Sequence, residues 1–183
     1  MIIIKKWSLN FSDVKFKIYI MSILSWENHT IPKNIIPKKL YGRLEPAMWG
    51  KETTLLIIPK IISVEIFKKV MSHISLDKST LMRLPKDCVV TPNSLVTHYI
   101  TYDINDTYEI TKHDDGCNLT MIIYLYKDTN VKDEFYIDGK ECKEDRWNLN
   151  DNSYGVLSFN GNDIHWGKLE GKGTRKVLVF HYN

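Results

Sequence analysis

The chain has 183 residues, of which 43% are hydrophobic and 11% aromatic, and its formal net charge is +3. This composition argues against intrinsic disorder, and the length suits a single domain that buries a core of its own. Because 22 acidic residues nearly balance 25 basic ones, the charge by itself does not indicate a nucleic-acid-binding protein. We expect one structural domain, with residues 1–60 as an N-terminal extension and loops that pack on a core formed by residues 61–183.

The cysteines and the hydropathy pattern indicate the cellular compartment of the protein. Cys88, Cys117 and Cys142 are irregularly spaced and form no C-x-x-C motif, which disfavours a disulfide framework and favours a reducing compartment. No apolar run approaches the roughly 20 residues that a membrane-spanning helix needs. The N-terminal run MIIIKKWSLNF is interrupted by lysines and lacks the pattern of a signal peptide. We therefore expect a cytoplasmic protein without a membrane partner.

The first predicted elements lie between residues 22 and 74. Prolines at positions 32, 37, 46 and 59 predict loops and short strands for residues 22–60. The following segment, IISVEIFKKVMSHIS, predicts an amphipathic helix on the outside of a sheet, because its apolar residues recur at helical spacing. We expect Ser63 to cap this helix and Glu65 to lie in its first turn, where a carboxylate suits the helix dipole.

From Cys88 onward the pattern predicts strands. The segments SLVTHYITY, LTMIIYLY, EFYI, GVLSF and RKVLVFHY are rich in β-branched and aromatic residues, and turn signals such as Asp138-Gly139 and Asn160-Gly161 separate them. Many short strands after a helix predict a protein that is mainly β with an N-terminal helix, in the form of a jelly roll or sandwich.

The last predicted strand carries an unusual arginine. Arg175, Val177, Val179 and His181 alternate along it and so share one face. An arginine among valines on an inward face is costly to bury unpaired, so we expect an anionic partner. That partner is either the carboxylate of a ligand or an acidic residue of the chain.

Two histidines and an aspartate suggest a metal site. On a strand, His113 and Asp115 point to the same side while Asp114 points away, which favours Asp115 as a ligand. His165 follows the apolar strand 155–159, and we expect a loop after it. Two imidazoles and one carboxylate are the ligand set of the facial triad that binds non-haem Fe(II). Each residue alone has ordinary structural explanations, so the hypothesis depends on their combination with Arg175.

The segment from Tyr99 to Asn183 resembles the catalytic core of the Fe(II)/2-oxoglutarate-dependent oxygenases, especially their prolyl-hydroxylase-like branch. That family has a tyrosine-led strand into H-x-D, then T-x-x-x-Y-L, then G-x-x-x-F before a second histidine, and an arginine or lysine nine or ten residues later. The corresponding residues here are Tyr102, His113, Asp115, Thr120, Tyr124, Leu125, Gly155, Phe159, His165 and Arg175. The Gly-Gly pair that usually follows the Tyr-Leu strand is missing.

This resemblance implies a double-stranded β-helix that hydroxylates a protein or peptide side chain, with succinate and CO₂ as co-products. It implies that His113, Asp115 and His165 bind Fe(II), with 2-oxoglutarate and O₂ as cosubstrates and ascorbate as a candidate accessory reductant. Arg175 and Tyr124 would bind the distal carboxylate of 2-oxoglutarate, and Tyr102 would lie near its metal-chelating end. Tyr108 competes with Tyr102 for that place, because the spacing from Tyr102 to His113 differs from the family pattern.

Two alternative functions stay open. A nucleic-acid demethylase of the same superfamily could use the cluster Lys33, Lys38, Lys39, Arg43 and Trp49 to bind a strand, although its gap between the second histidine and the arginines is normally longer. A non-catalytic, cupin-like jelly roll could hold a metal or a small ligand, but it would have no use for a carboxylate clamp. We expect His98 to be a packed or solvent-bridged histidine.

Overall fold

The computed structural model describes residues 3–11, 14–22, 26–45, 53–74, 91–143, 147 and 152–183. The N-terminal elements are β1 (Ile3–Phe11), β2 (Val14–Ser22), β3 (Trp26–Pro32), the 3-10 helix η1 (Lys33–Ile35), β4 (Arg43–Glu45), β5 (Thr53–Ile57) and the helix α1 (Lys60–Met71). The later strands are β6 (Leu95–Ile104), β7 (Thr107–His113), β8 (Leu119–Lys127), β9 (Val131–Ile137), β10 (Lys140–Cys142), β11 (Ser153–Phe159), β12 (His165–Gly171) and β13 (Gly173–Tyr182). Cys88 and Trp49 lie outside the described residues.

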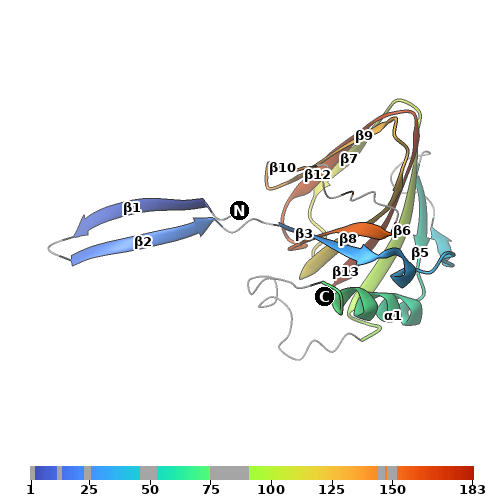
Figure 1. Cartoon of the computed structure of the whole chain (residues 1–183), viewed down its shortest axis with the longest axis horizontal. Helices are drawn as coiled ribbons and strands as arrows, with labels where there is room; N and C mark the ends of the chain where they lie inside the picture. Colours follow the sequence, from blue (N-terminus) through green and yellow to red (C-terminus); the bar gives the residue numbers. More distant parts are fainter. Residues whose placement is uncertain are drawn as a thin grey trace.

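From β6 onward the chain winds between two antiparallel sheets. The larger sheet has the strand order β3-β11-β8-β13-β6-β5-β4, and the smaller has the order β10-β9-β12-β7. The strands β6, β8, β11 and β13 therefore lie in one sheet, and β7, β9, β10 and β12 lie in the other (Figure 1). This arrangement is a double-stranded β-helix, or jelly roll. It confirms the predicted fold class, a mainly β protein with a helix before its core strands.

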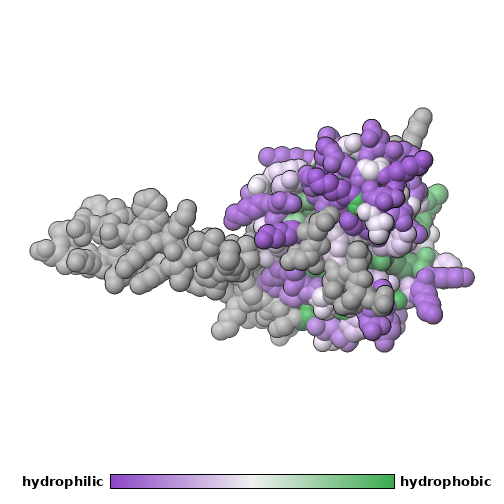
Figure 2. Space-filling model, turned by 45° about the horizontal axis from the view of Figure 1, so that its top comes forward, coloured by the Kyte–Doolittle hydropathy of each residue, from purple (hydrophilic) through white to green (hydrophobic). Residues whose placement is uncertain are grey.

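The smaller sheet shows why these sequences form strands with one buried face. In β9, Val131, Asp133, Phe135 and Ile137 are buried, and the residues between them are at least partly exposed. The strand β12 alternates in the same way. A period of two places one face toward the other sheet and the other toward solvent. The described surface is accordingly mainly hydrophilic in the view of Figure 2.

The helix α1 packs on the outside of the larger sheet, as predicted. Its buried Phe67 lies 5.5 Å from the ring of Phe180 and 5.8 Å from that of Tyr182, both on β13. The predicted cap was wrong, because the helix begins at Lys60 and Ser63 is buried inside it. The Ser63 hydroxyl donates to the carbonyl oxygen of Ile58 at 3.3 Å. Pro59, whose ring fixes φ near the helical value, takes the capping position, so Glu65 also lies beyond the first turn.

Two predictions near the metal-ligand candidates also need correction. His113 is the last residue of β7, so Asp115 lies in the turn after the strand and not on it. His165 begins β12, where we expected a loop. The apolar signal of this strand is weak because Gly167 occupies an inward position. A Cβ there would lie 2.7 Å from the carbonyl oxygen of Glu134, so the close approach of β9 requires glycine.

The N-terminal part contains short strands and loops, as predicted. The strands β3 and β5 extend the larger sheet by pairing with β11 and β6. Among the described strands, β1 and β2 pair only with each other. Within the described residues, no helix has the length and apolarity to cross a membrane.

Candidate metal centre

Strand pairing brings the two predicted histidines face to face. His165 on β12 is the antiparallel partner of His113 on β7, and their ring centroids lie 4.3 Å apart. Asp115 completes the group, and the ligand atoms of the three side chains lie within 4.8 Å of one another. The structure thus brings together the three residues that we predicted as metal ligands.

Both histidines are held in the tautomer that a metal ligand needs. Nδ1 of His113 lies 2.6 Å from the carbonyl oxygen of Thr111, and Nδ1 of His165 lies 3.0 Å from that of Asp163. Because a carbonyl oxygen can only accept, each Nδ1 carries a proton and donates it. In the neutral imidazole this leaves the Nε2 lone pair for a metal, and such support is usual for metal-binding histidines.

Both Nε2 atoms face the carboxylate of Asp115. His113 Nε2 lies 3.7 Å from Oδ1, and His165 Nε2 lies 3.6 Å from Oδ2. Ligand atoms that each lie about 2.1 Å from one cation are about 3 to 4 Å apart, so this spacing suits a single cation. The Thr120 hydroxyl donates to Oδ2 at 2.5 Å and fixes the orientation of the carboxylate. Asp114, by contrast, is exposed.

Burial and neighbouring charges set the protonation of the group. Burial lowers the pKa of His165, which favours the neutral imidazole that ligation requires. Burial alone would raise the pKa of Asp115, but His181, His165 and Thr120 together lower it to about 2. At neutral pH, Asp115 is therefore a carboxylate beside a neutral His165.

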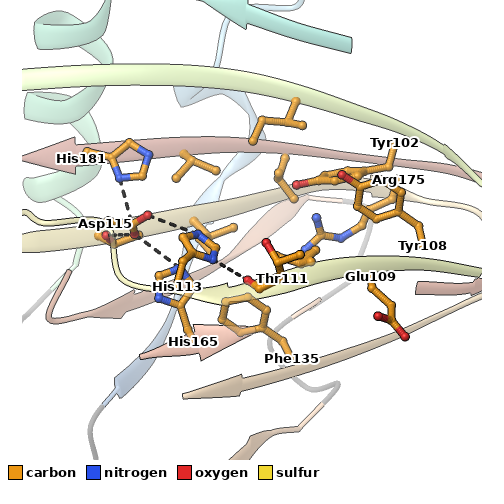
Figure 3. Close-up of a pocket in the computed structure, with 16 residues that line it drawn as sticks. Tyr102, Tyr108, Glu109, Thr111, His113, Asp115, Phe135, His165, Arg175 and His181 are labelled. Atoms are coloured by element: carbon orange, nitrogen blue, oxygen red, sulfur yellow. Dashed lines mark hydrogen bonds and ion pairs between the residues drawn. The ribbon is translucent and has the colours of Figure 1, made fainter. Parts of the chain in front are cut away.

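The triad lies at one end of a cavity of about 380 Å³, and Arg175 lies at the other (Figure 3). The walls between them are mainly apolar and include Ile100, Ile122 and Val179 from the larger sheet. As predicted, Arg175, Val177, Val179 and His181 all face this interior from β13. A cavity with apolar walls and a few polar groups is the usual form of a site for a small ligand.

Arg175 is buried beside an acidic residue. Its exposed fraction is 1%, and its Nε donates to Oδ2 of the equally buried Asp133 at 2.8 Å. Trp147 Nε1 donates to the same oxygen at 3.0 Å. Burial would lower the pKa of Arg175, but the charge of Asp133 raises it, so the guanidinium stays protonated. Asp133 is thus an anionic partner from the chain itself, yet Arg175 still lines the cavity.

Two tyrosines lie beside Arg175. Tyr102 is its partner in the pairing of β6 with β13, and Arg175 Cζ lies 4.9 Å from the Tyr102 ring centroid. Tyr108 packs edge-on against Tyr102 at 5.2 Å, and both line the cavity. Burial raises the pKa of Tyr102 to about 12, so its hydroxyl stays protonated. Tyr102 therefore lies at the arginine end of the cavity, whereas we expected it near the metal.

Tyr124 does not line the cavity. It is fully buried, with its ring 4.6 Å from that of Trp147 and its centroid 5.8 Å from Arg175 Cζ. In the structure it packs beside the guanidinium. No sequence pattern pointed to Trp147, whose ring packs against Tyr124.

Further residues adjoin Asp115 that the sequence did not assign to the site. His181 Nδ1 lies 3.6 Å from Asp115 Oδ2, and Cys117 lies close to both. Burial opposes protonation of His181, but Asp115 and Cys117 raise its pKa to about 9. His98 packs edge-on against His181 at 5.2 Å, and burial and the charge of His181 lower its pKa to about 4. In the sequence, His181 was noted only because it shares a strand face with Arg175, and no pattern pointed to Cys117 as a site residue.

The donor set fits Fe(II), and the far end of the cavity fits a carboxylate. Two imidazole nitrogens and one carboxylate bind non-haem Fe(II) and leave three coordination positions open. At the far end, the Arg175 guanidinium offers charged donors in an otherwise mostly apolar cavity, which suits a carboxylate.

No protein-family model matches the chain, and a search of curated proteins found no match. Among solved structures, the chain is similar to a prolyl-4-hydroxylase from Pseudomonas putida, with a TM-score of 0.49 and 11% identity over 87% of this chain and 92% of that one. It is also similar to a bsmA homologue from Methylobium petroleophilum PM1, with a TM-score of 0.37 and 14% identity over 49% of this chain and 40% of that one. Both similarities concern the fold only.

Proposed function

We propose that this protein is an Fe(II)- and 2-oxoglutarate-dependent dioxygenase that hydroxylates a side chain of a protein or peptide. The layout of the cavity is the observation that carries this proposal. Two histidines turn Nε2 toward one carboxylate at one end, and a buried arginine lies at the other. A protein that only stores a metal would need the first feature and not the second.

The residues of the chain have distinct roles in this proposal. His113, Asp115 and His165 would bind the metal, and Arg175 would bind the distal carboxylate of 2-oxoglutarate through its terminal nitrogens, since Asp133 takes Nε. When bound, Fe(II) with 2-oxoglutarate and O₂ supplies the oxidation of a substrate C–H bond to C–OH, with succinate and CO₂ as co-products. Ascorbate would serve as an accessory reductant.

The apolar walls have a role of their own. Ile100, Ile122, Val177 and Val179 line the cavity from strands of the larger sheet. They exclude water from the space around the cosubstrate, which strengthens the attraction between the guanidinium and a carboxylate. They also offer no hydrogen-bonding group that would compete with Arg175 for its ligand.

The position of β7 supports a peptide substrate. In the described part of the chain β7 is an edge strand of the smaller sheet, and Tyr108, Glu109, Ile110, Thr111 and His113 line the cavity from it. An edge strand presents backbone donors and acceptors to which an extended peptide can pair. A side chain of that peptide would then reach toward the triad.

A nucleic-acid substrate has less support. The basic residues that we considered for strand binding, Lys33, Lys38, Lys39 and Arg43, are not among those that line the cavity. Arg43 also forms an ion pair with Glu45. These charges lie on η1 and β4 or in the loop between them, and not at the site of the proposed chemistry.

Succinate formation tests the proposed reaction. The protein is purified without oxygen and supplied with Fe(II), 2-oxoglutarate and then O₂, with and without ascorbate. We expect slow succinate formation without a prime substrate, and its loss in His165→Ala. The matched control is His73→Ala, because His73 is exposed at the end of α1, far from the triad in sequence and outside the cavity lining.

Binding measurements separate the alternatives if succinate is absent. Binding of 2-oxoglutarate that requires metal and fails in His165→Ala would indicate an enzyme that needs its prime substrate for turnover. A protein that binds neither Fe(II) nor 2-oxoglutarate would contradict the proposal and favour the non-catalytic jelly roll.

A further inference from the structure

Asp115 belongs to a second cluster of side chains of the types that bind metals. Ligand atoms of Asp115, Cys117 and His181 lie within 4.8 Å of one another, as those of the triad do. His181 lines the cavity on the side of Asp115 away from the two triad histidines (Figure 3). We propose that Asp115, Cys117 and His181 form a second metal position, which binds a thiophilic divalent cation such as Zn²⁺ in competition with the triad.

The turn after β7 holds Cys117 in place. Gly116 has φ +60°, a conformation that favours glycine, and it reverses the chain between Asp115 and Cys117. The backbone N–H of Asp115 donates to the carbonyl oxygen of Gly161 at 2.7 Å, and Asn118 N–H donates to that of Tyr182 at 2.9 Å. The second bond fixes the turn to the strand that carries His181. Backbone contacts therefore hold the position together.

Gly161 brings another part of the chain against the thiol. A Cβ at this residue would lie 2.2 Å from Cys117 Sγ, so only glycine allows the contact. Asn162 Nδ2 donates to the carbonyl oxygen of Cys117 at 3.1 Å and holds it from the same side. The thiol makes long contacts with the Leu119 carbonyl oxygen at 3.4 Å and the Thr120 hydroxyl at 3.3 Å. These contacts cost little to replace with a metal–sulfur bond.

His181 supplies an independent observation that points to a ligand. Its Nδ1 atom is buried and makes no hydrogen bond with any residue that the structure describes. The carboxylate oxygen of Asp115 lies 3.6 Å away, which is longer than a hydrogen bond. A buried polar atom in this state calls for a partner, and a cation between Nδ1 and the carboxylate would satisfy both.

The ligand chemistry distinguishes the two positions. A thiolate, an imidazole and a carboxylate with one place left for water are typical of four-coordinate Zn²⁺. The triad has no sulfur and suits Fe(II). With Cys117 as a thiolate the second set carries two negative charges, against one for the triad, so it attracts a divalent cation more strongly. As the metal binds, Cys117 releases its thiol proton and the His181 imidazolium releases one proton, both to solvent.

The shared carboxylate makes the two positions compete. Asp115 Oδ2 lies 3.6 Å from His165 Nε2 and also 3.6 Å from His181 Nδ1. A cation bound beside His181 draws this oxygen away from the triad and weakens metal binding there. Zn²⁺ has no redox chemistry, so its binding would inhibit an oxygenase. That last consequence rests on the proposed function, whereas the metal position does not.

Cobalt titration tests the position with the metal alone. Co²⁺ replaces Zn²⁺ as a spectroscopic probe and is added without oxygen to the metal-free protein. We expect a thiolate-to-cobalt charge-transfer band in the near ultraviolet that Zn²⁺ abolishes. The band should disappear in Cys117→Ser and persist in the matched controls Cys142→Ser and Cys88→Ser. It should also persist in His165→Ala, which removes a triad ligand only.

The cobalt titration can support or overturn the second metal position. A wild type without the band, or a folded Cys117→Ser variant with an unchanged band, would overturn the proposal. X-ray absorption at the zinc edge of the wild type decides the question if the variant fails to fold, since we expect one sulfur at about 2.3 Å. A shell of nitrogen and oxygen ligands only would exclude Cys117. A cobalt–thiolate band in a protein that forms no succinate and does not bind 2-oxoglutarate would leave this position intact and contradict only the proposed oxygenase activity.

Discussion

The ion pair between Arg175 and Asp133 offers the sharpest test of how the cavity is built. Both side chains are at most 2% exposed, and Nε and Oδ2 lie 2.8 Å apart. The informative change is Asp133→Asn, because asparagine keeps the shape and can still accept the hydrogen bond from Trp147. It removes the negative charge and leaves the guanidinium buried.

The expected cost is large. Removing one partner of a buried ion pair typically destabilises a protein by about 3 to 5 kcal/mol, because the remaining charge is uncompensated. The whole unfolding free energy of a domain is about 5 to 15 kcal/mol. We therefore expect Asp133→Asn to lose a large part of its stability. The double variant Asp133→Asn with Arg175→Met, which removes both charges and keeps an acceptor for Trp147, should lose much less than Asp133→Asn alone.

Urea unfolding of the wild type, Asp133→Asn and the double variant measures these differences in stability. Repeating it with 2-oxoglutarate present tests whether Arg175 binds a ligand. If Arg175 binds a ligand carboxylate, that ligand replaces the lost anion in Asp133→Asn, so it should raise the midpoint of this variant more than that of the wild type. The double variant should not respond. A loss below about 1 kcal/mol in Asp133→Asn, the range of exposed ion pairs, would refute the reasoning.

Three further predictions address the triad and the core. Asp115→Asn should lower the affinity for Fe(II) or Co²⁺ by more than roughly 100-fold, the upper range for loss of a residue that only supports a ligand, while the adjacent exposed Asp114→Asn should not, as equilibrium dialysis would show. In the metal-free protein, the pKa of Asp115 is lowered to about 2 from an ordinary value of 3.8, so this group adds stability above pH 3.8 that is lost as the pH falls through 2. The pKa of His181 is raised to about 9 from an ordinary value of 6.5, so this group adds stability below pH 6.5 that is lost as the pH rises through 9. His181→Gln should therefore destabilise the metal-free protein most between about pH 4 and 6.5 in urea unfolding, and an equal effect at pH 10 would contradict the pairing. Phe67→Ala should cost about 3 to 5 kcal/mol and the exposed Ile61→Ala less than about 0.5 kcal/mol by the same assay, and equal losses would mean that α1 does not pack as described.

The parts of the fold that sequence predicted are those with a strong local period. The inward face of β13 could be predicted because Arg175, Val177, Val179 and His181 alternate without interruption. The strand β12 could not, because Gly167 removes one apolar residue from its inward face. The predicted start of α1 was wrong because serine is a common helix cap, whereas Ser63 lies one turn inside the helix.

In the candidate site, too, some residues could be predicted from the sequence and others could not. Ligand identity could be read from residue types, and the structure brings His113, Asp115 and His165 together. The residues that set their surroundings could not be predicted, because they are distant in sequence or belong to no motif. Asp133 lies 42 residues before its partner Arg175. Tyr102 was expected near the metal, but its register with Arg175 depends on strand pairing that no local pattern encodes.

The two ends of the cavity connect the two sheets by different means. At one end, Arg175 on β13 of the larger sheet forms an ion pair with Asp133 on β9 of the smaller sheet, and this connection needs no ligand. At the other end, His113 and His165 belong to the smaller sheet, while the turn that carries Asp115 is bonded to β13 and to Thr120 on β8 of the larger sheet. A cation held by all three ligands therefore joins the sheets there. Since metal binding to such a group contributes directly to folding, the metal would close the end of the jelly roll that the ion pair does not reach.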